Sequence, residues 1–286
     1  MDILSPSVLK NLCIQYGLSP SKEYGQNYLI SDKPIRAMIE SAEVTLEDTI
    51  VEIGPGFGVL TLTIAPLVKK LIAFEIEKKL EKYWEEKMAE QKNIEMVWGN
   101  ALYKWEEQVS QLKQFTVIAN LPYQITSHIL RLILESKYKP EQVIVMVQKE
   151  VAERICAKPG DMSLLGVSVQ LYGDPKVICK VPRGSFWPSP KVDSAVLSIK
   201  IHKENQPTAW STHGSKNPSL DERAFFDMVR AGFSHPRKQL WSNLSKVFAD
   251  TDWKVILQEV TGNEKIRAEE LSVEDWKKVF YFFRKD

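Results

Sequence analysis

The sequence predicts an α/β protein with a mostly parallel sheet in its first two thirds and a small helical domain at its end. Three observations lead to this prediction. Short β-branched runs alternate with helical stretches between residues 49 and 147, as in strands joined by crossover helices. A glycine-rich segment follows the first strong strand. Beyond residue 220, apolar side chains recur with helical spacing.

Five runs rich in β-branched and aromatic residues predict the strands of the sheet. They are residues 49–53, 71–74, 94–98, 115–119 and 143–147. Helical stretches lie between them, including 78–91, with Glu and Lys at i,i+4 spacing, and 127–135. Two further strand candidates, 176–181 and 194–201, flank a proline-rich stretch. Strands joined by crossover helices form parallel sheets that are covered on both faces.

The chain is expected to divide after residue 202. Residues 203–219 are rich in Ser, Asn, Thr and Pro and have no apolar periodicity apart from Trp210, which predicts a linker. We therefore expect one domain over 1–202, a linker over 203–219 and a helical domain over 220–286.

Composition narrows the class of protein. An apolar content of 44% and a charged content of 26% are ordinary for a soluble globular protein. No apolar run reaches the roughly 20 residues of a membrane span, and the N-terminus lacks the pattern of a signal peptide. Three scattered cysteines and four histidines without ligand spacing predict neither a disulfide framework nor a metal site. A cytoplasmic protein without metal or membrane partner is expected.

Charge is unevenly distributed although the net charge is only +1. Residues 75–107 carry nine acidic and six basic residues, whereas residues 176–240 carry eleven basic and five acidic ones. This asymmetry is compatible with an anionic partner at the C-terminal half. It is equally compatible with two solvated surfaces of unlike sign.

The glycine-rich segment runs from Glu52 to Gly58 and leads into a stretch that can open a helix. Gly54 and Gly56 allow a tight turn and a close approach of the backbone to a ligand. The third glycine follows too soon for a dinucleotide fingerprint, and Glu52 is more typical of S-adenosylmethionine (SAM) sites. Glu75 ends the next strand and could accept hydrogen bonds from the ribose hydroxyls of an adenosine group. The alternative is a glycine turn without a ligand.

A second motif, Asn120-Leu121-Pro122-Tyr123, closes the fourth strand at the edge where open α/β sheets bind ligands. The adenine N6 amine is a poor nucleophile because its lone pair is delocalised into the ring. The Asn120 side-chain oxygen and the Leu121 carbonyl could accept its hydrogens and concentrate the lone pair on the nitrogen. Pro122 stiffens the loop, and Tyr123 offers a ring on which an extruded base can stack. The motif predicts methylation of adenine N6.

Further motifs occur in order at 25–29, 147–154, 186–196 and 233–240. With the two motifs above, they make the chain resemble, over nearly its whole length, the KsgA (RsmA) family of small-subunit rRNA adenine N6,N6-dimethyltransferases. The resemblance implies a Rossmann-like SAM-binding domain of seven strands, a small helical rRNA-binding domain, and Phe186 stacking on the target adenine opposite Tyr123. The cofactor-binding residues expected on this basis are Gln26, Asn27, Leu29, Gly54, Gly56, Glu75, Asn100, Ala101 and Asn120.

The implied reaction is the transfer of two methyl groups to each of two adjacent adenines near the 3′ end of small-subunit rRNA, during ribosome maturation. The implied partner is the small ribosomal subunit and its rRNA, bound by a monomer. Candidate phosphate contacts are Arg183, Lys191, Arg230, Arg237 and Lys238, although exposed basic residues are more often simply solvated. Asn100 departs from the family, which usually has Asp there; its amide oxygen can still accept a hydrogen bond, but without the charge.

Three other functions fit part of this pattern. The macrolide-resistance methyltransferases, which modify one adenine of large-subunit rRNA, share the glycine loop and the Asn-x-Pro-Tyr signature. A mainly non-catalytic assembly factor for the small subunit is disfavoured by the intact glycines, Glu75 and Asn120. A DNA adenine methyltransferase would not explain the motifs at 186–196 and 233–240.

Overall fold

The computed structural model describes residues 3–18, 27–202 and 220–284. The chain forms two compact units. The first comprises Met1–Ala152 with Gly173–Ser211, and the second comprises Glu153–Tyr172 with Thr212–Asp286. Residues 153–172, which the sequence places in the first domain, thus group with the helical unit. The predicted linker over 203–219 lies outside the described residues.

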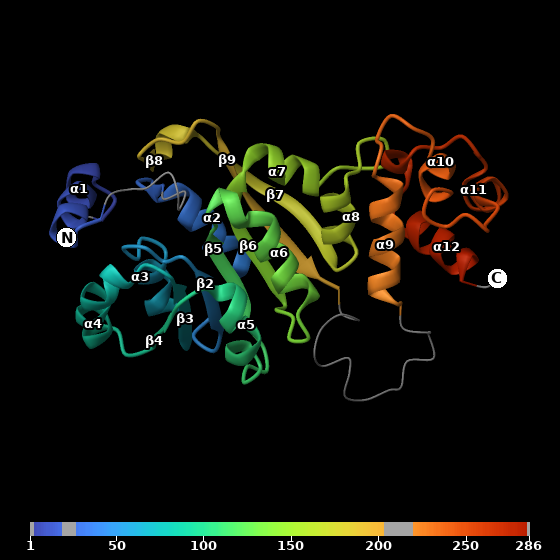
Figure 1. Cartoon of the computed structure of the whole chain (residues 1–286). Helices are drawn as coiled ribbons and strands as arrows, with labels where there is room; N and C mark the ends of the chain where they lie inside the picture. The colour runs from blue at the N-terminus through green and yellow to red at the C-terminus, as the bar shows by residue number, and fades with distance from the viewer. Residues whose placement is uncertain (1–2, 19–26, 203–219, 285–286) are drawn as a thin grey trace. The chain divides into compact units, whose positions relative to one another are not determined.

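The first unit is built on a seven-stranded sheet (Figure 1). Its strand order is β4 (Ile94–Trp98), β3 (Lys70–Glu75), β2 (Thr49–Ile53), β5 (Thr116–Asn120), β6 (Gln142–Gln148), β9 (Ser194–Ile201) and β7 (Gly173–Val181). The first five strands are parallel, and β9 runs antiparallel to both β6 and β7. The predicted mostly parallel sheet of seven strands is confirmed.

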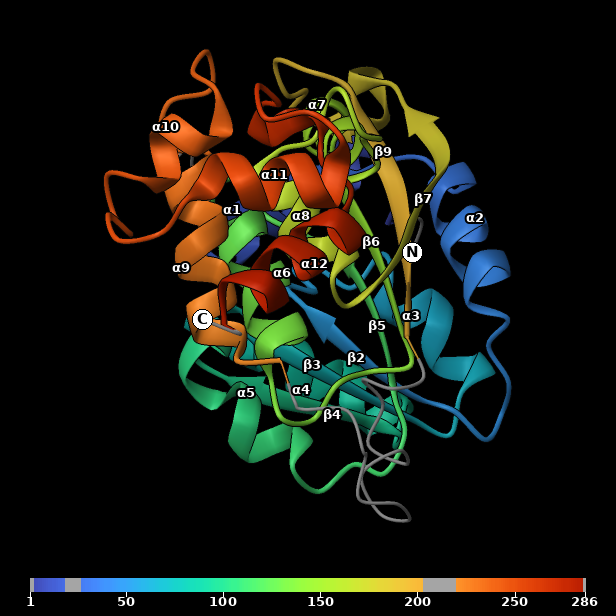
Figure 2. The same ribbon diagram turned by 90° about the vertical axis from the view of Figure 1, so that its right-hand side faces the viewer.

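Helices cover both faces of this sheet, which explains the continuous apolar runs of its central strands. Val143 to Val147 in β6 are all 0% exposed. In Figure 2, α2 (Lys33–Ala42) and α3 (Thr61–Ile64) lie on one side of the sheet, and α5 (Ala101–Val109) and α6 (Thr126–Glu135) lie on the other. The remaining helices of at least seven residues that begin in this unit are α1 (Pro6–Gln15), α4 (Glu81–Glu90) and α7 (Lys149–Ile155).

A second, two-stranded sheet joins distant parts of the same unit. β1 (Tyr28–Leu29) pairs antiparallel with β8 (Phe186–Trp187), in the register Tyr28↔Trp187 and Leu29↔Phe186. Strands of two residues carry no periodicity that a sequence could show. They form here because all but Trp187 of these side chains are buried against the core.

The second unit is helical. It contains α8 (Leu164–Gln170), α9 (Glu222–Gly232), α10 (Leu240–Leu244), α11 (Trp253–Thr261) and α12 (Val273–Phe283). Phe225 of α9 packs edge-on against Phe280 of α12, with ring centroids 5.7 Å apart. The Tyr172 hydroxyl, which follows α8, donates to Glu222 at 2.7 Å and ties the segment 153–172 to α9. The apolar stripes predicted beyond residue 220 thus form the core of this unit.

Candidate active site

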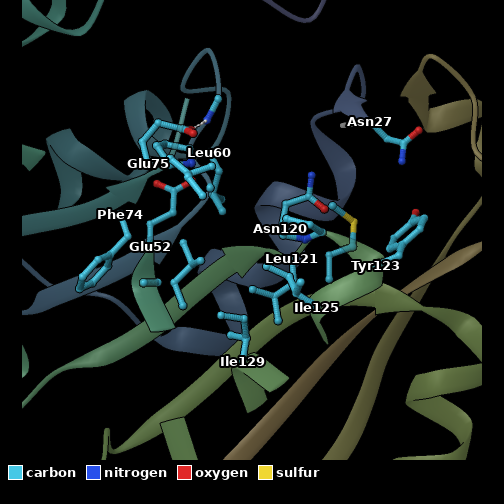
Figure 3. Close-up of a pocket in the computed structure, with 18 of the residues that line it drawn as sticks. Asn27, Glu52, Leu60, Phe74, Glu75, Asn120, Leu121, Tyr123, Ile125 and Ile129 are labelled. Atoms are coloured by element: carbon cyan, nitrogen blue, oxygen red, sulfur yellow. Dashed lines mark hydrogen bonds between the residues drawn. The ribbon is translucent and has the colours of Figure 1, made fainter. Parts of the chain in front are cut away.

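A cavity of about 330 Å³ opens at the carboxyl ends of β2, β3, β4 and β5 (Figure 3). The chain leaves β2 for β3 on one side, and β5 lies on the other side of β2. This reversal of strand order is where open α/β sheets bind their ligands. The residues that line the cavity include both sequence motifs, from Glu52 to Phe57 and from Asn120 to Tyr123.

The glycine loop forms one wall of the cavity. Gly54, Gly56 and Gly58 have φ values of 73°, 55° and 80°, which residues with a Cβ rarely adopt. Two aromatic side chains of α4 hold the loop from behind: the Trp84 indole donates to the Gly56 carbonyl at 3.0 Å, and the Tyr83 hydroxyl donates to the Phe57 carbonyl at 2.7 Å. The loop is therefore a fixed cradle.

Glu75 lies at the end of β3 and is 6% exposed. Its Oε2 accepts a hydrogen bond from the Gly56 backbone N–H at 3.1 Å, and its Oε1 accepts one from the Glu77 N–H at 2.8 Å. Burial raises its pKa, and these backbone hydrogen bonds oppose the rise. Each carboxylate oxygen has a second lone pair with which it could receive a hydroxyl of a ligand.

Glu52 also lines the cavity, although it is not among the cofactor-binding residues expected from the sequence. Its side chain is 1% exposed, and its Oε2 has no hydrogen-bond partner in the described part of the chain. Burial raises the pKa of Glu52 to about 8; the nearby Thr61 hydroxyl opposes this, although its geometry falls short of a hydrogen bond. A buried, unpartnered carboxyl in a cavity is a candidate ligand contact. Its position before the glycines was the signal that could have placed it among the cofactor residues.

Asn100 and Ala101 line the cavity at the start of α5. The Asn100 side-chain oxygen accepts a hydrogen bond from the Leu102 N–H at 2.9 Å and so caps the helix. The neighbouring Gly99 N–H donates to the Glu75 carbonyl at 2.7 Å, which fixes this loop to β3. The Asn100 oxygen therefore has one backbone partner already, and only its second lone pair is left for a cofactor.

The tetrapeptide forms the wall opposite Glu52 and Glu75 (Figure 3). Asn120 ends β5 opposite Met146, and the Leu121 N–H donates to the Met146 carbonyl at 3.2 Å. The Pro122 carbonyl accepts from the Ile125 N–H and from the Thr126 hydroxyl, both at 3.2 Å. These bonds fix the backbone of the motif between β5 and α6.

Tyr123 is held at its tip. Its hydroxyl shares a hydrogen bond of 2.5 Å with the hydroxyl of Ser194, the first residue of β9. Burial raises the pKa of the Tyr123 phenol, so the ring is neutral at physiological pH. Asn27 also lines the cavity, and Figure 3 shows it on the side of Tyr123 rather than on that of Glu75.

Not every expected site residue lines the cavity. Phe186 is 3% exposed and packs in the core of the unit; it does not line the cavity as the structure stands. Leu29, its partner in the two-stranded sheet, does line it and is 4% exposed. Gln26 lies outside the described residues.

The five expected phosphate contacts are all exposed. Arg183 and Lys191 lie in the connection between β7 and β9 of the first unit, on either side of β8, whereas Arg230, Arg237 and Lys238 belong to the helical unit. Arg230 forms an ion pair of 2.6 Å with Asp227 on its own helix. Arg237 and Lys238 lie in the turn between α9 and α10.

Comparison with known proteins decides the family. The family model "Ribosomal RNA adenine dimethylase" matches residues 18–285. The chain belongs to this family. A protein of Dehalococcoides mccartyi named ribosomal RNA small subunit methyltransferase A is 38% identical over 282 residues, which cover 96% of this chain and 93% of that one. A protein of the same name from Bacillus cytotoxicus is 36% identical over 287 residues, with coverage of 96% and 95%.

Solved structures share the fold. A dimethyladenosine transferase from Plasmodium falciparum has a TM-score of 0.74 at 23% identity and covers 90% of this chain and 97% of its own. The 23S rRNA methyltransferase ErmE has a TM-score of 0.66 at 24% identity, with coverage of 89% and 98%. The family, the fold and the enzyme class expected from the sequence are confirmed.

Within the described ranges, no cluster of three or more His, Cys, Asp or Glu side chains could hold a metal ion. Among the helices of those same ranges, none is both long and apolar enough to cross a membrane.

Proposed function

We propose that this chain transfers methyl groups from SAM to the N6 amines of two adjacent adenines near the 3′ end of small-subunit rRNA, two to each, during ribosome maturation. The main support for this proposal is that the glycine-rich segment and the tetrapeptide Asn120 to Tyr123 line the same cavity. Glu52, Glu75 and the glycine loop line one side of it, and Asn120 to Tyr123 line the other. The family and its small-subunit relatives support the choice of substrate.

The residues around the cavity fit SAM. Gly54 and Gly56 offer a backbone cradle, and a Cβ at Gly56 would meet the Tyr28 ring at 3.3 Å. The second lone pairs of the Glu75 carboxylate would receive the ribose hydroxyls. The Asn100 oxygen would receive the adenine amine, and the unpartnered Glu52 Oε2 would face the cationic part of the cofactor. When bound, SAM supplies an electrophilic methyl group on a positively charged sulfur.

The chain's own contribution is to orient and activate the target amine. Asn120 Oδ1 and the Leu121 carbonyl would accept the two N6 hydrogens and draw the nitrogen toward tetrahedral geometry. The lone pair then points at the methyl group, and no strong base is required because the N6 proton becomes acidic once the methyl is bound. Tyr123 supplies a stacking face for the extruded base. We also propose that Phe186 stacks on the target adenine opposite Tyr123. Because Phe186 is buried, the base would have to displace the side chains that cover it.

The proposed partner is the small ribosomal subunit, bound through rRNA phosphates by the basic residues of both units. The protein is proposed to act as a monomer in the cytoplasm. Its three cysteines are free thiols, as is usual in that compartment.

Assays of purified small and large subunits, each from cells deficient in adenine methylation, with SAM labelled in its methyl group would test the substrate. Label in the small subunit alone is expected. Label in the large subunit would instead support the macrolide-resistance activity. The Asn120→Ala variant serves as the control for non-enzymatic labelling, and transfer at the wild-type rate by this variant would contradict the proposed role of Asn120.

A further inference from the structure

The hydrogen bond between Tyr123 and Ser194 links two residues 71 positions apart in the chain. Tyr123 belongs to the short 3-10 turn that follows Pro122, and Ser194 begins β9. The two hydroxyl oxygens are 2.5 Å apart, a short distance even for a bond between hydroxyl groups. Both residues belong to the first unit.

Ser194 is held firmly by its surroundings. It is 0% exposed and is paired on both sides, with Gln148 of β6 and Val181 of β7. The preceding residue, Asp193, is also anchored: its carbonyl accepts from the Lys149 N–H at 3.0 Å. Its carboxylate accepts from the Arg183 N–H at 2.9 Å. The Ser194 hydroxyl is therefore presented from a rigid frame at the end of the central sheet.

Tyr123, by contrast, is only half-buried. Pro122 restricts the backbone before it, but the backbone does not by itself select among the staggered χ1 rotamers of the aromatic side chain. The phenol oxygen lies on the long axis of the ring, so a hydrogen bond at that atom fixes the direction of the axis. In the part of the chain that the structure describes, Ser194 is the one side chain that hydrogen-bonds to this hydroxyl.

We propose that Ser194 is a positioning residue for methyl transfer: it holds the Tyr123 ring in the orientation that receives the adenine base. This inference rests on the proposed function, in which Tyr123 stacks on the base. Ser194 does not touch the substrate, and it acts through the tyrosine alone. Pre-orienting the ring removes a rotational freedom that base binding would otherwise have to restrict.

A double-mutant cycle tests the proposal. Ser194→Ala and Tyr123→Phe each remove the same bond, from opposite ends, and leave the aromatic ring in place. We expect each to lower kcat/KM for undermethylated small subunits by roughly five- to tenfold, the equivalent of one neutral hydrogen bond. Because the bond can be lost only once, the double variant should be no slower than the slower single variant. SAM affinity, measured by calorimetry on the protein without RNA, should not change.

Ser198→Ala is the matched control. Ser198 lies on the same strand, is 7% exposed, and accepts a hydrogen bond from the Gln142 side chain at 2.9 Å. This variant loses a buried hydroxyl of the same kind away from the tetrapeptide, so its kcat/KM should stay at the wild-type value. If Ser194→Ala lowers stability, Tyr123→Phe still tests the bond from its half-buried end.

Separate outcomes distinguish the proposal from the function on which it rests. Wild-type protein that fails to methylate the small subunit would contradict the proposed function itself. Active wild type with a Ser194→Ala variant of unchanged kcat/KM would overturn the role of Ser194. Losses in the two single variants that add in the double variant would overturn it too, because the residues would then act independently.

Discussion

Replacement of Glu52 by Gln is expected to change how stability depends on pH. The carboxyl is buried, and its pKa is raised from the ordinary 4.5 to about 8. The folded protein therefore keeps the Glu52 proton at pH values where the unfolded chain has lost it. The favourable contribution of this neutral form is fully present below about pH 4.5 and is lost as the pH rises toward 8.

The size of the effect follows from the two pKa values. Each tenfold difference in proton affinity is worth roughly 1.4 kcal/mol. Between pH 4.5 and pH 8, Glu52 alone should therefore lower the free energy of unfolding by on the order of 4 kcal/mol. The isosteric Gln cannot ionise, so the Glu52→Gln variant should lack this loss and exceed the wild type in stability at pH 8.

Urea unfolding of the cofactor-free protein, followed by tryptophan fluorescence at several pH values, measures this difference. Trp84 and Trp105 are 0% exposed in the same unit and report on its unfolding. Glu85→Gln, at an exposed position of α4, controls for the loss of a charge as such. Parallel pH curves for the wild type and Glu52→Gln would contradict this prediction, because Glu52 would then ionise equally in the folded and unfolded states.

Three further predictions concern the loops and the RNA contacts. Gly58→Ala should cost roughly 1–3 kcal/mol of stability and weaken SAM binding, because φ is 80° and a Cβ would lie 2.8 Å from the Trp84 ring; an unchanged urea midpoint would argue against this. Asn100→Asp should keep the helix cap and bind SAM more tightly by calorimetry, because it adds a charge at the residue proposed to receive the cofactor adenine; equal affinity would count against that proposed contact. Replacing Arg237 and Lys238 by Gln should weaken binding to the small subunit and reduce the slope of log K against log salt by roughly 1–2; an unaltered slope would exclude phosphate contacts there.

Much of the sheet could be predicted because most of its strands are short, continuous runs of apolar and β-branched residues, a signal that is visible in the local sequence. The run 143–147 is continuous and apolar, and it forms the core of β6, which extends one residue further at each end. The strand predicted at 176–181 begins earlier, at Gly173, because pairing with β9 starts at Gly173↔Ile201. The missed residues, Gly173, Asp174 and Pro175, are of types that strands disfavour, so only the neighbouring strand determines where this strand begins.

Features that depend on distant pairing could not be predicted. The two-residue strands β1 and β8 exist only because residues 28–29 and 186–187 meet in the core. The hydrogen bond between Tyr123 and Ser194 likewise joins the tetrapeptide to the motif at 186–196. The sequence shows that both motifs are present but not that they are in contact. Residues 153–172 group with the helical unit through contacts such as the hydrogen bond from Tyr172 to Glu222. These residues are 50 positions apart, so no local sequence pattern predicts the contact.

Mapping the methylated nucleotides would show whether Asn120 to Tyr123 methylate adenine N6 in small-subunit rRNA, as we propose. Undermethylated small subunits would be incubated with SAM and either the wild type or Asn120→Ala, and the rRNA would be digested and analysed by mass spectrometry. We expect N6,N6-dimethyladenosine at two adjacent adenines near the 3′ end with the wild type, and none with the variant. Methyl groups on another base, at another atom of adenine, or at equal levels with the variant would contradict it.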